Sequence, residues 1–188
     1  MKDSTKVIVN NANELLLEII EDYSKTKQME LASVKNNEMS KESFLNNAKE
    51  HILFFYKVPE NVLNDTLQMF EDYVFGYSIL TELINNPDIS DIRCTGYNKI
   101  SCKRKGHRET VPISFQSKEE YSRFVDFVAT RNQISLSNLN AIQSFSDNET
   151  NPDYILRFTI AMPLVNTYDE PYLCIRKVAK NFPTLEML

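Results

Sequence analysis

The sequence predicts an α+β protein, in which an N-terminal helical bundle is followed by a small antiparallel sheet with covering helices. Up to about residue 76, apolar residues recur at helical spacing, whereas beyond residue 88 short runs rich in β-branched residues are separated by turn residues. Of the 188 residues, 42% are hydrophobic and 25% are charged, which is typical of a globular chain with a buried core.

The helical part is expected to contain three amphipathic helices. An apolar run from Leu15 to Tyr23 indicates the first helix, and Ser40 offers an N-cap for the second. Pro59 is suited to the start of the third helix, and Gly76 is suited to its end. The polar stretch 25–41 is expected to be a loop or a weak helix.

The second part is expected to be a sheet with helices over it. A short apolar helix ends before Pro87, because proline cannot continue a helical hydrogen-bond ladder. Ser117 and Glu120 form a capping box for a helix that should cover the sheet. The polar stretch 133–152 is expected to be a loop. The expected elements are a helix at 79–84, strands at 89–95, 99–105 and 108–115, a helix from 117 to 131, and strands at 154–162 and 172–177.

Each of the last two predicted strands carries one arginine, and the alternation of apolar residues indicates on which face of the strand it lies. In the strand 154–162, the even-numbered residues are apolar and point one way, so Arg157 points the other way. In the last strand, Arg176 shares a face with Tyr172 and Cys174. The sequence therefore predicts two guanidinium groups on strands of the same sheet.

The composition excludes several kinds of chemistry. Gly76, Gly96 and Gly106 are the only glycines, and they lie too far apart to form a phosphate-binding loop. His51 and His107 do not stand in a paired-ligand arrangement. A formal net charge of −5 argues against a surface that binds nucleic acid over its whole extent. The sequence also contains no apolar stretch of membrane-spanning length and no export signal, so we expect a cytoplasmic protein.

The three cysteines form no C-x-x-C pair. Without an export signal, Cys94, Cys102 and Cys174 are expected to be reduced thiols in buried strands, and no metal ion is expected. A zinc site made of these cysteines and His107 is the alternative.

A cluster of basic residues marks the turn between two of the predicted strands. It is interpreted as a solvated hairpin whose cations protect a sheet edge, and the alternatives are contact with nucleic acid, acidic lipid or a partner subunit. The cluster consists of Lys99, Lys103, Arg104, Lys105, His107 and Arg108.

A series of short motifs follows in a fixed order from residue 76 onward. The motifs are G-Y-S-I-L-T-E-L at 76–83, N-P-D-I-S-D-I at 86–92, I-S-C-K-R at 100–104 between two glycines, L-R-F at 156–158 with I-A-M-P at 160–163, C-I-R-K at 174–177 and F-P-T-L-E at 182–186. In order and spacing, this series resembles the N-terminal domain of the secretion traffic ATPases, the hexameric motors of type II and type IV secretion, conjugation and pilus assembly. The glycine of the family's G-x-R-V strand is replaced in this sequence by Leu156 or one of its neighbours.

The resemblance implies a division of the chain into three parts. Residues 1–76 would be a helical N-terminal segment, 77–180 a PAS-like α+β N-terminal domain, and 181–188 the start of a linker to a RecA-like ATPase domain that this sequence lacks. The apolar and acidic residues at 183–188 look like an unfinished helix, and a frayed tail is the alternative interpretation. The phosphate loop and catalytic groups would belong to the missing domain, so this chain alone would not be an active enzyme.

The resemblance also implies nucleotide-binding residues. In this family ATP lies between the two domains, and Arg157 and Arg176 would approach its phosphates, with surface ion pairing as the alternative role. Arg131 is a minor candidate, because as the last residue of its helix it can simply interact with the final carbonyl groups. ATP and Mg²⁺ would be needed only by the full-length protein.

The implied function is that of a regulatory and oligomerisation domain which moves with the nucleotide cycle of a homo-hexamer. Its partners would be its own RecA-like domain and inner-membrane secretion or conjugation components, at the inner face of the cell membrane. Two alternatives come from other classes: a non-catalytic sensory or adaptor module that binds a small ligand or a protein, and a hairpin protein that binds nucleic acid, which the acidic net charge disfavours.

Overall fold

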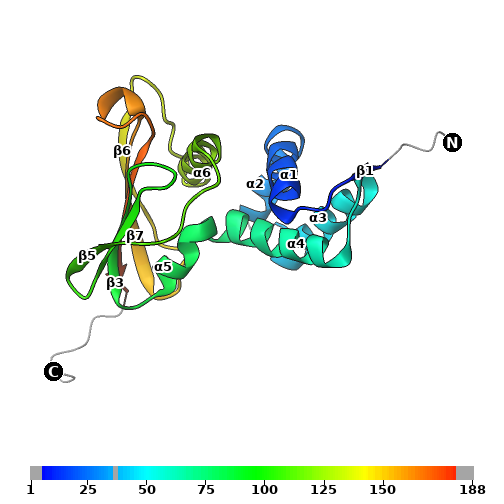
Figure 1. Cartoon of the computed structure of the whole chain (residues 1–188), viewed down its shortest axis with the longest axis horizontal. Helices are drawn as coiled ribbons and strands as arrows, with labels where there is room; N and C mark the ends of the chain where they lie inside the picture. Colours follow the sequence, from blue (N-terminus) through cyan, green and yellow to red (C-terminus); the bar gives the residue numbers. More distant parts are fainter. Residues whose placement is uncertain (1–5, 36–37, 181–188) are drawn as a thin grey trace. The chain divides into compact units, whose positions relative to one another are not determined.

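The computed structural model describes residues 6–35 and 38–180; the predicted linker at 181–188 lies outside the described residues. By its internal contacts the chain divides into two units, residues 1–78 and 79–188. The first unit is mainly helical, and the second contains a six-stranded antiparallel sheet with helices (Figure 1). The predicted α+β class is therefore confirmed.

The described residues of the helical unit form the three predicted amphipathic helices and one short helix, which lies in the stretch 25–41 where a loop or a weak helix was predicted. Ser40 is the N-cap predicted for the second long helix, and its hydroxyl accepts a hydrogen bond from the Ser43 amide. Gly76 follows the third long helix as its C-cap. The elements are β1 (Val7–Ile8), α1 (Ala12–Thr26), α2 (Gln28–Lys35), α3 (Lys41–Phe55), β2 (Tyr56–Lys57) and α4 (Glu60–Phe75).

The core of the helical unit is aromatic. Tyr23 of α1 packs edge-on against Phe44 of α3 and Phe70 of α4, with ring centroids 5.4 and 5.0 Å apart. All three rings are almost fully buried, so these contacts join the three long helices. Within the described ranges 6–35 and 38–180, none of the helices is both long and apolar enough to cross a bilayer.

The sheet unit is built from two three-stranded meanders that meet side by side. The strand order is β5-β4-β3-β8-β7-β6, and all neighbours are antiparallel. The elements are η1 (Ser78–Leu80), α5 (Thr81–Asn85), β3 (Ile89–Cys94), β4 (Ile100–Arg104), β5 (His107–Thr110), α6 (Lys118–Arg131), β6 (Ile142–Asp147), β7 (Tyr154–Ala161), η2 (Pro163–Val165) and β8 (Tyr172–Ala179).

Helix α6 packs on one face of this sheet, which we call the covered face; the opposite face is the open face. It connects β5 and β6, which are the two opposite edge strands, so the chain must cross the sheet between them (Figure 1). The predicted cap is present, because the Ser117 hydroxyl accepts from the Glu120 amide. Buried Tyr121 fixes α6 to the sheet by donating its hydroxyl to the carbonyl groups of Pro171, at 2.9 Å, and Cys94, at 3.4 Å.

One predicted loop is wrong in part. Within the polar stretch 133–152, β6 pairs with β7 over its whole length. Ser144 and Ser146 of β6 lie on the open face of the sheet. Phe145 lies on the covered face, where its ring stacks on the ring of Phe158 with centroids 5.0 Å apart. The stretch forms a strand because one side of an edge strand can remain polar and still complete the ladder.

Candidate anion-binding site

The two arginines predicted from sequence lie directly opposite one another on neighbouring strands. Arg157 of β7 and Arg176 of β8 are register partners, and both are exposed on the open face of the sheet. Residues on either side of each arginine are buried on the covered face, which confirms the predicted alternation. Directly opposed side chains of an antiparallel pair have Cβ atoms about 5 Å apart, so this arginine pair can contact one small ligand.

Asp91 of β3 holds one member of the arginine pair. The Arg176 Nε donates to Asp91 Oδ1 at 2.9 Å, and Ser90 Oγ donates to Asp91 Oδ2 at 2.7 Å. Burial disfavours the charge of Asp91, but the bonds from Ser90 and Arg176, with the nearby cations, outweigh it and lower the pKa of this carboxyl. The carboxylate is therefore ionised and holds Arg176 by its Nε alone.

A β-bulge places Asp91 on the open face. Ile89 pairs with Arg104 and Asp91 pairs with Lys103, so Ser90 is an extra residue in β3. Without it, Ile89 and Asp91 would share a face; with it, Ile89 is buried with the core and Asp91 faces Arg176. Sequence reasoning missed Asp91. A signal was present, because an unbroken strand would have put apolar Ile89 on the same face as two charged residues.

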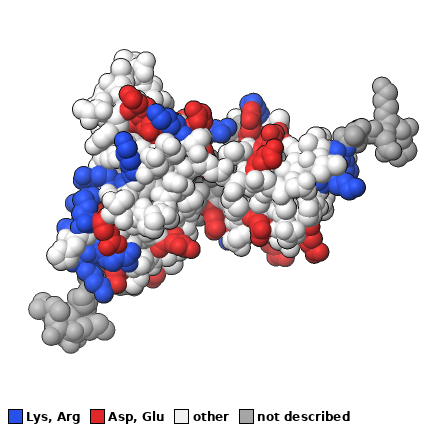
Figure 2. Space-filling model, in the orientation of Figure 1, with Lys and Arg blue, Asp and Glu red and all other residues white. Residues whose placement is uncertain are grey.

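Further cations surround the arginine pair. One row of register partners crosses the sheet from Arg108 through Lys103, Asp91 and Arg176 to Arg157. Figure 2 shows Lys and Arg gathered over the part of the sheet where β3, β4 and β5 lie. We call the open-face charged residues of the strands the basic face; they are Arg93, Lys103, Arg108, Arg157, Arg176 and the single carboxylate Asp91.

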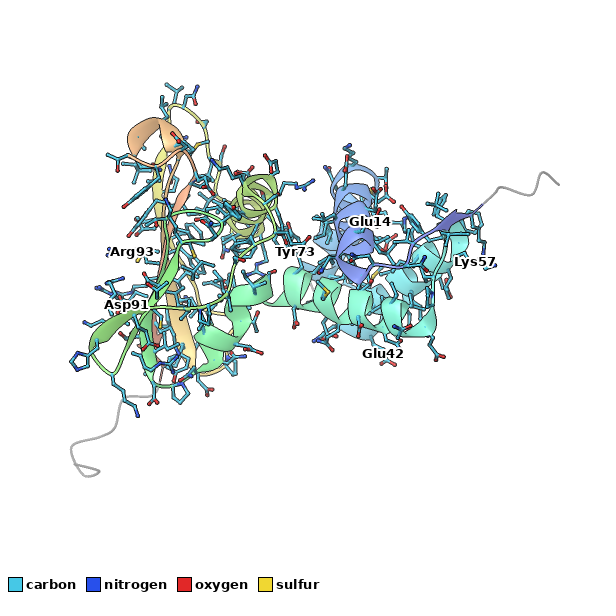
Figure 3. The ribbon with its side chains drawn as sticks, in the orientation of Figure 1. Glu14, Glu42, Lys57, Tyr73, Asp91 and Arg93 are labelled. Carbon is cyan, nitrogen blue, oxygen red and sulfur yellow. The ribbon has the colours of Figure 1, made fainter. Side chains whose placement is uncertain are left out.

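Arg93 extends the basic face along β3, next to Asp91 (Figure 3). Its guanidinium carbon lies 5.9 Å from the centre of the Tyr172 ring, a cation–π distance. Tyr172 belongs to the same face as Cys174 and Arg176, as the sequence predicted. An aromatic ring therefore adjoins the cations on this side of the sheet.

The predicted basic hairpin separates into two groups. Arg104 and Lys105 form ion pairs with Glu109 and Asp88, at 2.6 and 3.2 Å. The charge of the hairpin turn is thus largely neutralised by local carboxylates, whereas Lys103 and Arg108 contribute to the basic face.

Arg131 is not brought to the arginine pair. It ends α6, and its Nη2 lies 3.9 Å from Asp147 Oδ2, on the covered side of the sheet. Asp147 in turn accepts hydrogen bonds from the amides of Glu149 and Thr150 and so fixes the turn after β6. The sheet separates Arg131 from Arg157 and Arg176, and its contacts are those of a structural residue.

The cysteines are separated by the sheet in a similar way. Cys94 and Cys102 are buried on the covered face, while Cys174 is half-buried on the open face. Burial raises the pKa of the Cys94 thiol. Within the described parts of the chain, no three His, Cys, Asp or Glu side chains are grouped closely enough to hold a metal ion.

The arrangement can bind an anion without a metal ion of its own. Two always-charged arginines occupy directly opposed positions on the open face, and the contact from Asp91 uses only the Nε of Arg176, whose side chain is 67% exposed. In the parts of the chain that the structure describes, no carboxylate lies within ion-pair distance of Arg157. Phosphate or carboxylate oxygens could therefore accept hydrogen bonds from both side chains.

Comparison with known proteins finds no match in sequence and a likeness in structure. The sequence matches no protein-family model, and it matches none of the curated proteins. Part of the structure is similar to part of the VirB11 ATPase from the Brucella suis type IV secretion system, solved in complex with sulphate, with a TM-score of 0.46 and 16% sequence identity. The match covers 57% of this chain and 32% of that chain, so the chain spans about a third of the length of that ATPase.

Proposed function

We propose that this chain is the N-terminal region of a secretion or conjugation ATPase, and that Arg157 and Arg176 bind the phosphates of a nucleotide held by a RecA-like motor domain. The observation that carries the proposal is the direct opposition of these two arginines on an exposed face, where the carboxylate of Asp91 bonds Arg176 only. The ordered motifs from residue 76 to 186 support the same class of protein.

The electrostatics of the arginine pair favour a bound anion. Like charges directly opposite one another in a sheet destabilise it, so two neighbouring guanidinium groups lower the stability of the empty site. A phosphate between them removes this repulsion and gains charge-assisted hydrogen bonds. A guanidinium also discriminates between charge states of a nucleotide, because its hydrogen bonds strengthen as phosphate charge increases.

In the proposed motor, these contacts are mechanical and not catalytic. ATP and Mg²⁺ are held by the motor domain, and the arginine pair closes onto the phosphates from the N-terminal side. Loss of the terminal phosphate then releases the N-terminal domain. ATP thus shifts the population toward the closed conformation, because that conformation binds ATP better than the released one does. Six such subunits would form a ring in the cytoplasm that works with inner-membrane secretion components.

The test uses the whole chain and inorganic triphosphate. We expect triphosphate and ATP to shift the amide resonances of β7 and β8 in NMR titrations, and Arg157→Gln and Arg176→Gln each to weaken binding by roughly tenfold. Arg123→Gln is the matched control, because Arg123 is an exposed cation on α6, away from the basic face. Its affinity should equal that of the unmodified chain.

A second experiment separates the motor from a binding module. The chain is joined to a RecA-like ATPase domain, and ATP turnover is compared with and without Arg176→Ala. Reduced turnover supports the proposed motor. Unchanged turnover and nucleotide affinity would remove the arginine role, and triphosphate binding without any effect on turnover would favour a sensory or adaptor module.

A further inference from the structure

Five large apolar side chains are exposed together at one end of the helical unit. Three occupy the last turn of α3 and two form β1, which pairs with β2 immediately after that turn. We call this group the apolar tip; its members and exposed fractions are Phe54 71%, Ile8 67%, Val7 59%, Phe55 50% and Leu53 41%.

Contacts within the structure show that these residues are neighbours. Val7 lies opposite Tyr56, the residue that follows Phe55, and Phe54 and Phe55 pack edge to face with ring centroids 4.8 Å apart. The buried face of α3, by contrast, is formed by Phe44, Ala48 and Ile52. The apolar tip is therefore separate from the core that holds the helices together. Exposed apolar residues gathered in this way usually mark an interaction surface.

Lysines are the only charged residues along the chain segments that form the apolar tip. Lys6 donates its Nζ to the Leu53 carbonyl at 2.7 Å, and exposed Lys57 lies opposite Ile8. Segments 6–9 and 52–59 contain these two lysines and no Asp or Glu, although residues 1–78 as a whole have a net charge of −5. Figure 2 shows Lys or Arg at this end of the unit, and Figure 3 labels Lys57 there.

We propose that the apolar tip inserts into the interfacial region of an anionic lipid membrane, with Lys6 and Lys57 at the level of the headgroups. Surfaces that lie in a membrane interface typically combine phenylalanine and leucine with neighbouring lysine. Lysine is depleted from protein–protein interfaces, so the pairing of apolar residues with lysine favours lipid over a protein partner. The lysines supply positive charge at the apolar tip of an acidic unit, whereas the carboxylates that act on Tyr56, those of Glu18 and Asp22, lie on α1.

The absence of tryptophan in this sequence allows a direct test. We would replace Phe54 by Trp and measure fluorescence of the whole chain with vesicles of phosphatidylcholine and phosphatidylglycerol. Insertion predicts a blue shift and quenching by lipids brominated in their acyl chains. Met29→Trp is the matched control, because Met29 is 85% exposed on α2, outside the apolar tip. Trp at position 29 should be neither shifted nor quenched.

Vesicle sedimentation tests the two kinds of residue separately. The double variant Phe54→Ser/Phe55→Ser should reduce vesicle binding by at least roughly tenfold. Lys6→Gln/Lys57→Gln should reduce binding only when phosphatidylglycerol is present, and should remove its salt dependence. These positions are exposed, so the variants should retain the circular dichroism spectrum of the parent.

Two results would overturn the membrane proposal. One is the absence of acyl-chain quenching at position 54; the other is a chain that associates with itself through the apolar tip, so that Phe54→Ser/Phe55→Ser abolishes a dimer and leaves vesicle binding unchanged. The proposal does not depend on nucleotide binding. Arg157→Gln/Arg176→Gln should leave the quenching at position 54 unchanged.

Discussion

The Nε of Arg176 donates to Asp91 Oδ1 at 2.9 Å, and this bond joins β8 to β3 across the centre of the sheet. The two strands belong to different meanders, so the ion pair lies where the two halves of the sheet meet. It also draws the Arg176 side chain toward β3, on the opposite side of β8 from Arg157 of β7. Asp91 is thus a positioning residue of the candidate site.

The first prediction concerns the acid sensitivity of this ion pair. The folded-state pKa of Asp91 is lowered, so its contribution to stability is complete above the pKa of an unfolded Asp and is lost as pH falls through the folded-state pKa. Urea unfolding of the parent and of Asp91→Asn should therefore converge at acidic pH and differ by a small, constant amount near neutrality. A difference that persists undiminished in acid would contradict this assignment.

The second prediction concerns the repulsion within the arginine pair. Without ligand, Arg157→Gln should slightly raise the thermal midpoint, because it removes a like charge directly opposite Arg176. Arg176→Gln should not raise it, because this change also removes the bond to Asp91. Added triphosphate should raise the midpoint of the parent chain more than that of either variant, because each variant binds it more weakly. Scanning calorimetry of the three proteins measures each effect.

The sequence was sufficient to predict the long helices and the positions of the two arginines. Apolar residues at helical spacing and local caps such as Ser40 and Ser117 depend only on nearby residues, and the alternation around Arg157 assigns its face without knowledge of the partner strand. These features are local, so one sequence contains the information that they require.

The features that sequence analysis missed depend on pairing between distant segments. β6 is mostly polar and becomes a strand only because β7 supplies its hydrogen-bond partners. The role of Asp91 depends on the bulge at Ser90 and on Arg176, which is 85 residues away. The position of Arg131 could not be predicted from sequence for the same reason. Arg131 lies away from the arginine pair because α6 crosses the covered face of the sheet.

The third prediction tests how α6 is held on the sheet. Tyr121→Phe removes the hydroxyl that bonds the buried carbonyl group of Pro171 and leaves the ring in place. We expect a loss of roughly 1–3 kcal/mol in the free energy of unfolding, because a buried acceptor is left without its donor. Urea denaturation measures the loss. Tyr168→Phe is the control; Tyr168 is partly exposed, and its variant should be nearly as stable as the parent.

The last prediction uses Lys177, a lysine on the covered face of β8. Its Nζ donates to the Asn86 carbonyl and lies 4.1 Å from the centre of the Tyr154 ring. Burial lowers the pKa of Lys177 from 10.5 to about 8. Between these two pH values the unfolded chain binds more protons than the folded chain, so the free energy of unfolding should rise with pH.

Comparison with Lys177→Met isolates this contribution from other groups that titrate in the same range. The stability of the parent relative to the variant should be constant below about pH 8 and should then increase by on the order of 2 kcal/mol as pH approaches 10.5. Exposed Lys99→Met should show no such trend relative to the parent. A parent and a Lys177→Met variant with parallel pH profiles would show that this lysine keeps its proton in the folded sheet, held by Asn86 and Tyr154.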